Sequence, residues 1–337
     1  MKVCQVLASR GDGGLEKHTI ELVKGLYKNG IDVTVIAHKD LAKHFKDIRF
    51  IPMDLEKSRN NVWMLYRLYK VLKNESFDII HAQANKATSI IVKLKPFLHS
   101  KIVATLHNYK KNLKPFLKAD AVITVSDRIG EKLNCKYKTT VYNGIETSTE
   151  KMTDLHETFN INKDKFIISS VGRLVEAKGF DLLIESMQYV DNDICLLIIG
   201  DGPLREKLEN LSEKFHVTDK IKFLGSLDNS FTKSIIKSSD LLVISSRREG
   251  FSYVFAESLL LDTPIVSTDV ADIKKFITEE FIVPFDAVRL AKKTNMFRAN
   301  CDQNIATYQV IFNKAKNTFT LENMANQTIQ VYKSVVS

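Results

Sequence analysis

Short apolar runs alternate with amphipathic stretches along the first half of the chain. Residues 3–9 form an apolar run that ends at a glycine-rich segment, residues 11–14. Residues 15–27 follow with apolar side chains at helical spacing, and Gly30 stands where a helix C-terminal glycine is expected. Further strand candidates are residues 31–37, 77–81, 101–106 and 121–125, and a helical face is expected in 61–72 from Val62, Leu65, Tyr66, Tyr69 and Leu72. The pattern predicts a βαβ series, hence a parallel sheet covered by helices on both faces.

The same alternation restarts in the second half. A polar stretch, residues 146–165, predicts an interdomain linker with a short capping segment. A strand at 166–171 then leads through a loop, 172–179, into an amphipathic helix. Further strands are predicted at residues 194–199, 222–224, 241–245 and 265–267, and a last amphipathic helix at 321–336, whereas 279–317 show no clear pattern. The second half therefore predicts another doubly wound α/β domain.

Length and composition agree with two globular domains. The 337 residues exceed the roughly 150 of an ordinary domain, and 44% hydrophobic with 26% charged residues argues against disorder and against an integral membrane protein. The longest apolar runs, such as residues 195–199, are far shorter than the roughly 20 residues of a membrane span. No signal-peptide core is expected before the charged Arg10 and Asp12. The four cysteines are scattered without a Cys-x-x-Cys pair, which predicts a reduced cytoplasmic protein.

Positive charge is concentrated in the N-terminal half. The chain carries 49 basic and 40 acidic residues, a net charge of +9. Residues 1–145 hold 26 basic and 13 acidic residues, a net charge of +13, whereas the remainder has a net charge of −4. Such asymmetry indicates an anionic partner, either nucleic acid or a membrane surface, or else a solvated lysine-rich face.

The densest basic stretch lies between residues 79 and 119, which contain eight lysines and no acidic residue. Residues 109–118 interleave lysines with Tyr109, Leu113, Phe116 and Leu117. Exposed aromatic and leucine side chains among cations suit an anionic membrane, where each cation contributes on the order of 1 kcal/mol. We expect residues 86–118 to dock the protein peripherally on the inner face of the cell membrane; the alternative is a solvated lysine-rich face. No nucleic-acid partner is expected, because no helix-turn-helix or aromatic stacking platform is visible.

Loops at the carboxyl ends of parallel strands are where such sheets bind ligands. The segment from Gly11 to Glu16 is one such loop, in which glycines let a ligand approach the backbone. It is not a dinucleotide-binding fingerprint, and a tight turn is the alternative. The segment from Gly200 to Pro203 is interpreted as a structural strand-to-helix turn.

Two loops of the second half carry charges that suit a nucleotide sugar. Arg173 follows a strand directly and Lys178 comes five residues later, so the two cations can grip a diphosphate from two sides. Glu249 and Glu257 are eight residues apart, slightly over two helical turns, and are expected to share one side of a helix start. Glu249 suits sugar hydroxyls, and Glu257, within an apolar stretch, suits a ribose diol. The alternatives are a solvated loop and two ordinary helix acids.

In combination and order, these motifs resemble glycosyltransferase family 4. The resemblance covers roughly residues 1–278 and rests on Gly13-Gly14-x-Glu16, Asp78 to His81, Thr105 to His107, Tyr142 to Ile145, Arg173 with Lys178, Gly200 to Pro203, Glu249 to Phe251 with Glu257, and Pro264 to Val266. It implies the GT-B fold, an α/β architecture of two Rossmann-like doubly wound parallel-sheet domains that face a central cleft. Residues 1–145 would form the acceptor-side domain, 146–165 the linker and 166–319 the donor-binding domain, with the C-terminal helix, 320–337, packing back on the first domain.

The resemblance also implies residue roles. Contacts to the donor are implied at six positions: Arg173 and Lys178 at the diphosphate leaving group, Glu257 at the ribose, and Glu249 with the backbone of Gly250 and Phe251 at the sugar. His107 matches a histidine beside the transferred sugar, and the loop with Gly13, Gly14 and Glu16 matches the segment that faces it. Gln83 departs from the family, because many relatives carry a second histidine after His81.

By this resemblance the protein is a retaining, metal-independent hexosyltransferase that needs no cofactor and uses a nucleotide-diphosphate sugar, with UDP as the expected nucleotide. The acceptor hydroxyl would attack from the face that the diphosphate leaves, so no enzymic nucleophile is required. The expected acceptor is a glycan or a lipid-linked sugar in the assembly of a bacterial-type cell envelope, such as lipopolysaccharide, capsule or glycolipid. The alternatives are another sugar-nucleotide enzyme of this fold, or a basic protein that binds or modifies nucleic acid.

Overall fold

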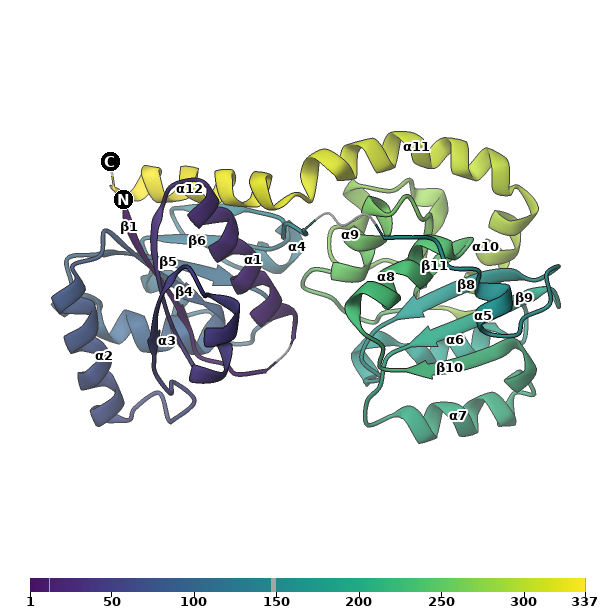
Figure 1. Ribbon diagram of the computed structural model, residues 1–337, viewed down its shortest axis with the longest axis horizontal. Helices are drawn as coiled ribbons and strands as arrows, with labels where there is room; N and C mark the ends of the chain where they lie inside the picture. Colours follow the sequence, from purple (N-terminus) through teal and green to yellow (C-terminus); the bar gives the residue numbers. More distant parts are fainter. Residues whose placement is uncertain (12, 147–149, 337) are drawn as a thin grey trace. The chain divides into compact units, whose positions relative to one another are not determined.

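The computed structural model describes residues 1–11, 13–146 and 150–336, so that residues 147–149 of the predicted linker lie outside the described ranges. The chain divides into two compact units: Met1–Glu146 with Thr318–Ser337, and Thr147–Asn317. Each unit contains one sheet with helices around it (Figure 1). No helix within the described ranges combines the length and the apolar character needed to cross a membrane.

The N-terminal unit is built on a seven-stranded sheet in the order β3-β2-β1-β4-β5-β6-β7, with all neighbours parallel. Its strands are β1 (Lys2–Leu7), β2 (Asp32–Ala37), β3 (Arg49–Pro52), β4 (Ile79–Gln83), β5 (Lys101–Leu106), β6 (Ala121–Thr124) and β7 (Lys138–Thr140). Its helices are α1 (Gly14–Lys28), α2 (Val62–Glu75), α3 (Ala84–Leu94), α4 (Asp127–Gly130) and α12 (Leu321–Val336). The predicted parallel sheet is confirmed. The two edge strands, β3 and β7, were missed because they are short and largely exposed or half-buried, and so lack an apolar run.

Alternate residues of the central strands face opposite sides of this sheet. On one side, Val3 and its neighbours pack in one apolar cluster with side chains of α1 and α12. On the other side, Cys4 belongs to a second cluster with side chains of α2 and α3. Helices α1 and α12, from opposite ends of the sequence, lie side by side (Figure 1), and a Cβ at Gly25 would lie only 2.9 Å from the Ala325 Cβ. Gly25 therefore allows the two helices to approach closely.

The face that α2 buries differs from the prediction. Met64, Leu68 and Leu72, spaced four residues apart, are buried, whereas Val62 and Tyr66 are exposed. The helix has two stripes of apolar residues, and only one of them can face the sheet. The other stripe leaves Val62 and its neighbour Trp63 on the surface, 78% and 72% exposed.

The C-terminal unit holds a six-stranded parallel sheet in the order β10-β9-β8-β11-β12-β13. Its strands are β8 (Phe166–Val171), β9 (Ile194–Ile199), β10 (Ile221–Gly225), β11 (Leu241–Ile244), β12 (Ile265–Thr268) and β13 (Ile282–Val283). Its helices are α5 (Leu155–Thr158), α6 (Phe180–Ser186), α7 (Arg205–Lys214), α8 (Asn229–Ser238), α9 (Tyr253–Leu260), α10 (Ala287–Ala299) and α11 (Cys301–Thr318). The second doubly wound sheet is thus confirmed, and the loops after β8 and β11 come from neighbouring central strands.

Residues 279–317, which show no clear sequence pattern, form β13 and the helices α10 and α11. The buried face of α10 is made partly of Ala287, Ala291 and Thr294, small or polar residues that blur the helical period. In α11 the buried side chains begin only at Tyr308, and the apolar Ile305 of the preceding turns is exposed. Both helices therefore depend on packing that a hydrophobicity pattern does not reveal.

Candidate active site

The loop between β8 and α6 carries two of the predicted site residues, Arg173 and Lys178. It ends at Gly179, which has φ +65 and so lies in the left-handed region. A Cβ there would lie 2.1 Å from the Ser245 carbonyl oxygen, closer than real Cβ atoms approach. The Ser245 hydroxyl also donates to the Lys178 carbonyl oxygen at 3.1 Å. Gly179 therefore allows the end of this loop to pack directly against the end of β11.

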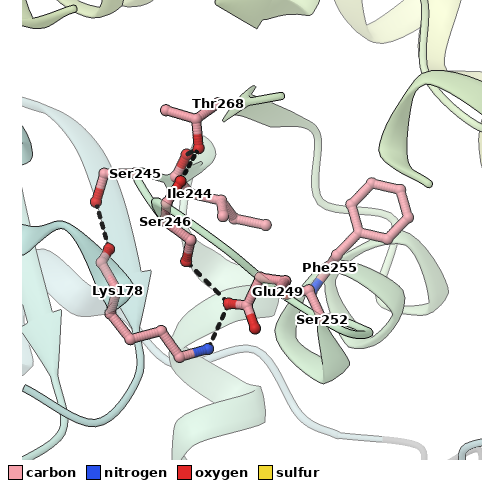
Figure 2. Close-up of polar contacts among 8 residues, drawn as sticks. All are labelled: Lys178, Ile244, Ser245, Ser246, Glu249, Ser252, Phe255 and Thr268. Carbon is pink, nitrogen blue, oxygen red and sulfur yellow. Dashed lines mark hydrogen bonds and ion pairs between the residues drawn. The ribbon is translucent and has the colours of Figure 1, made fainter. Parts of the chain in front are cut away.

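Lys178 and Glu249, from the loops after β8 and β11, point toward one another (Figure 2). The Lys178 Nζ lies 2.5 Å from Glu249 Oε1, and the Ser246 hydroxyl donates to the same oxygen at 2.9 Å. Thr268 in turn donates to the Ser246 carbonyl oxygen at 2.7 Å, which fixes the strand end that carries this serine. Glu249 Oε2 has no hydrogen-bond partner within the described part of the chain. The pair is thus held rigidly while one carboxylate oxygen stays available as an acceptor.

Arg173 is held by its backbone and presents its side chain to solvent. Gly200 has φ +135, and a Cβ there would lie 2.0 Å from the Gly172 carbonyl oxygen. A Cβ at Gly202 would lie 2.6 Å from the Leu174 carbonyl oxygen. The turn interpreted as structural therefore fixes the residues on both sides of Arg173. The guanidinium group is exposed and has no ion-pair partner among the described residues, so its charge is available to an anion.

The loop between β11 and α9 places Glu249, Gly250 and Phe251 before the helix and Glu257 inside it. Ser252 caps α9, since its side chain accepts from the Phe255 N–H at 3.4 Å, and the helix begins only at Tyr253. The expectation that Glu249 and Glu257 share one side of a helix start is therefore wrong, because Glu249 lies in the loop. Glu257 is buried in α9, 7% exposed, as its apolar sequence neighbours predicted.

Arg247 is a structural residue of this loop whose partners the sequence did not reveal. Its guanidinium group binds Asp181 with two hydrogen bonds, at 2.6 and 2.5 Å, and stacks on the Phe285 ring at 4.4 Å. The bidentate hydrogen bonds from Arg247 lower the pKa of the Asp181 carboxyl below its usual value. The contact ties the start of α6 to the loop that carries Glu249.

In the N-terminal unit, Glu16 shapes the loop that precedes α1. Its Oε2 accepts from the Gly13 N–H at 3.0 Å, and its Oε1 accepts from the Ser9 hydroxyl. Glu16 is 5% exposed, and Gly14 is the first residue of α1. Glu16 therefore caps the helix and holds the glycine loop; Asp12 of this loop lies outside the described residues.

His107 follows β5 and is held by a buried polar chain. Its Nε2 donates to Gln83 Oε1 at 2.9 Å, because an amide oxygen can only accept. Gln83 Nε2 donates to Gln5 Oε1 at 2.9 Å, and Gln5 Nε2 donates to the Tyr332 hydroxyl at 2.8 Å. The chain therefore links His107 to the C-terminal helix, α12, and it fixes the proton of the neutral imidazole on Nε2.

The Tyr332 hydroxyl continues this chain to a second histidine. It lies 2.7 Å from His81 Nδ1, and His81 Nε2 lies 2.6 Å from the Thr105 hydroxyl. Because the Tyr332 hydroxyl accepts a hydrogen bond from Gln5, it can donate a hydrogen bond to His81 Nδ1. Every polar side-chain atom of His81 is thereby satisfied, which identifies it as a positioning residue in the core.

Three buried histidines lie in this region, and all are neutral at pH 7. Burial lowers the pKa of His18 to about 4 and of His81 to about 3, and it places the pKa of His107 well below the usual 6.5. The rings of His18 and His107 meet edge to face with centroids 4.6 Å apart. His18 donates from Nδ1 to Asn143 Oδ1 at 2.9 Å, whereas its Nε2 is buried without a partner in the described residues. The unprotonated nitrogens are therefore Nδ1 in His107 and the buried Nε2 in His18.

Two family models match the chain, one in each half. The model described as Glycosyltransferase Family 4 matches residues 12–149, and the model described as Glycosyl transferases group 1 matches residues 151–300. The chain belongs to these glycosyltransferases. The resemblance inferred from the motifs is thereby confirmed, and the enzyme class with it.

Relatives of this glycosyltransferase include a Methanocaldococcus jannaschii protein described as an uncharacterised glycosyltransferase, 25% identical over 95% of this chain and 94% of its own. The lipopolysaccharide core biosynthesis glycosyltransferase LpsE of Rhizobium meliloti is 25% identical over 76% of both chains. Among solved structures, Anabaena HepE in complex with UDP and glucose superposes with a TM-score of 0.85 at 17% identity, over 99% of this chain and 100% of its own. The two parallel α/β sheets of this glycosyltransferase are accordingly those of the GT-B fold.

The predicted site residues of this glycosyltransferase are divided between the two units. Lys178, Glu249 and the Arg173 loop are linked by contacts within the C-terminal unit. His107 lies in the other unit, with Gln83 and His18 around it. Sequence reasoning overlooked His18, although its position on α1, directly after the glycine loop, was a usable signal.

Proposed function

We propose that this glycosyltransferase binds a nucleotide-diphosphate sugar, with UDP as the nucleotide, through the loops after β8 and β11. The observation that carries the proposal is the rigid Lys178–Glu249 pair beside the exposed Arg173. Two cations suit a diphosphate, and a carboxylate oxygen without a partner suits the hydroxyls of the sugar. The UDP complex of the structurally similar Anabaena protein supports this choice of nucleotide.

Each residue then has a role in the transfer. Arg173 and Lys178 hold the diphosphate and stabilise the charge that it gains as it leaves. The Glu249 carboxylate accepts hydrogen bonds from the sugar hydroxyls, and the backbone N–H groups of Gly250 and Phe251 donate to the sugar. Glu257 accepts from the ribose hydroxyls. His107 and the loop with Gly13, Gly14 and Glu16 contact the transferred sugar from the N-terminal unit. The neutral state of His107 suits hydrogen bonding to hydroxyl groups rather than acid catalysis.

The proposed reaction retains the anomeric configuration. The acceptor oxygen bonds to the anomeric carbon on the face from which the diphosphate departs, while the bond from that carbon to the diphosphate oxygen breaks. The acceptor proton passes to a diphosphate oxygen, so atoms and charge balance without an enzymic nucleophile. Cationic side chains supply the electrostatic stabilisation, and the reaction is proposed to need no metal ion.

The acceptor is proposed to be a glycan or lipid-linked sugar of a cell envelope. The relationship to a lipopolysaccharide core enzyme supports this class. We further propose that residues 86–118 contact the inner face of the membrane. Tyr109 and Leu117 are 47% and 50% exposed, but Phe116 is fully buried. The expectation that Phe116 helps to form the surface is therefore wrong; its ring packs inward from the short 3-10 turn Phe116–Lys118.

The test of the donor site is a comparison of three variants. Glu249→Ala and Lys178→Ala should reduce transfer by at least 10-fold, since one hydrogen bond to a charged group contributes about 1.5–3 kcal/mol. Lys207→Ala, which removes an exposed lysine from α7 of the same unit, is the matched control and should keep wild-type activity. Transfer is measured as nucleotide release from the UDP-, GDP- or ADP-sugar that raises the melting temperature most. Wild-type turnover in a folded Lys178→Ala protein would refute the assignment.

A further inference from the structure

A cavity of about 700 Å³ lies in the N-terminal unit, apart from the His107 group. Three segments form its walls: the loop between β3 and α2, the outer side of α3, and the loop that follows β5. Its lining includes six cationic side chains: Lys57, Arg59, Lys86, Lys93, Lys114 and Lys118. Among the lining residues that the structure describes, Glu56 is the single acidic one. The cavity is therefore strongly positive.

Carboxylates within residues 1–11, 13–146 and 150–336 do not compensate the positive charge of this cavity. Glu56 pairs with Arg10, outside the lining, at 2.9 Å. Among the residues that the structure describes, none of the six cations has an ion-pair partner. Six like charges around one cavity repel one another, and an anion that enters it lowers that repulsion.

The walls of the cavity are tied together by hydrogen bonds. Lys86 Nζ donates to the Glu56 carbonyl oxygen at 2.5 Å, and Lys93 Nζ donates to the Arg59 carbonyl oxygen at 2.8 Å. Asn85 Nδ2 donates to the Asn112 carbonyl oxygen at 3.2 Å. The helix α3 is thus linked to both neighbouring loops, so the cavity is preorganised for a ligand.

Arg59, Lys114 and Lys118 make no side-chain hydrogen bond or ion pair within the described ranges, so their charged groups are available. Arginine and lysine together are the usual ligands of phosphate groups. Ser58, Ser89 and Asn112 also line the cavity and suit the hydroxyl groups of a sugar. The volume lies within the roughly 300–1,000 Å³ of small-molecule sites and exceeds what a lone phosphate fills.

We infer that this cavity binds the phosphate or diphosphate group of a phosphorylated sugar, as the anionic end of the acceptor. The inference rests on the proposed function for its acceptor role, whereas the anion site itself rests on the lining. The phosphate can belong to a soluble sugar phosphate or to a lipid-linked sugar at a membrane, because both present the same group to the six cations.

The test is a calorimetric titration of inorganic pyrophosphate into the full-length protein, in the presence of excess UDP to occupy the donor site. Wild-type protein should bind, and the triple variant Arg59→Gln/Lys114→Gln/Lys118→Gln should bind at least 10-fold more weakly. The matched control, Lys28→Gln/Lys43→Gln/Lys46→Gln, removes three exposed lysines of the same unit outside the cavity and should bind as wild type. Equal binding by the two triple variants, or none by wild type, would overturn the inference.

Two further measurements distinguish failure of the donor-site proposal from failure of the cavity proposal, and a lipid phosphate from a soluble one. UDP binding should be retained in the cavity variant and lost in Lys178→Ala. If wild type binds pyrophosphate but not UDP, the donor-site proposal fails and the proposal for the cavity is retained.

To identify the source of the phosphate, vesicles that contain phosphatidic acid are compared with phosphatidylglycerol vesicles of equal surface charge. Preferential binding to phosphatidic acid, abolished in the cavity variant, identifies a lipid phosphate, whereas pyrophosphate binding without vesicle preference identifies a soluble one.

Discussion

Replacement of Gly179 by alanine tests how the donor loop is positioned. Gly179 has φ +65, and an alanine in the left-handed region costs about 1–2 kcal/mol. Its Cβ would lie 2.1 Å from the Ser245 carbonyl oxygen, and real contacts of this kind do not fall below 3.0 Å. The loop must therefore move by about 0.9 Å, the difference between these two distances. Lys178 is the next residue and moves with it.

A displacement of about 1 Å in a catalytic group lowers the rate on the order of 10²-fold. This corresponds to about 2.7 kcal/mol in the activation free energy. We therefore expect Gly179→Ala to reduce kcat/KM for the nucleotide sugar by about 10²-fold. The assay is steady-state nucleotide release, at a temperature well below the melting temperatures of all variants.

Gly30→Ala is the matched control for this substitution. Gly30 also has a positive φ, +74, but nothing lies within 4 Å of its Cβ position. The variant should lose a comparable amount of stability from backbone strain and keep its activity. If Gly179→Ala is folded and its kcat/KM stays within about 3-fold of wild type, below the 10²-fold expected from the displacement, the positional role of Gly179 is refuted.

Two predictions concern the buried polar residues of the N-terminal unit. Tyr332→Phe removes the hydroxyl that joins Gln5 to His81 and should lower the free energy of unfolding by about 1–3 kcal/mol in urea titrations; an unchanged value contradicts the hydrogen-bond chain. Because burial lowers the pKa of His18 to about 4 and of His81 to about 3, the unfolded chain binds more protons than the folded one below the usual pKa of 6.5. Stability should therefore fall as the pH drops from 6.5 to 5, by up to about 1.4 kcal/mol per pH unit for each histidine, and constant stability there contradicts their buried neutral state.

The sequence predicted the elements whose apolar period is strong. The central strands of both sheets and the final helix are present where the pattern predicted them, although β4, predicted at residues 77–81, spans Ile79–Gln83. The pattern failed where two apolar stripes competed, as in α2, and where buried positions hold small residues, as in α10. It also misplaced Phe116, because a basic context does not reveal that one aromatic side chain turns inward.

The site was predictable as a set of residues but not as a network. Lys178 and Glu249 were expected to bind a ligand, yet their contact across 71 residues was not predicted. The hydrogen bond from Gln5 to Tyr332 spans 327 residues, and no local spacing predicts it. Arg247 likewise has its partner Asp181 66 residues away. The contacts of Lys178 and Arg247 are set by the order of the strands in the sheet, which brings segments from distant parts of the sequence to one edge. The contact between Gln5 and Tyr332 is set by the packing of α12 on the sheet.

Arg173 and Lys178 are proposed to hold the diphosphate of a nucleotide sugar. Calorimetric titration of UDP into wild type and into the double variant Arg173→Ala/Lys178→Ala tests it most directly, with Lys207→Ala as the control. Wild type and the control should bind UDP alike, and the double variant should bind at least 100-fold more weakly, since each lost contact to a charged group removes about 1.5–3 kcal/mol. Equal affinity in a folded double variant would contradict it.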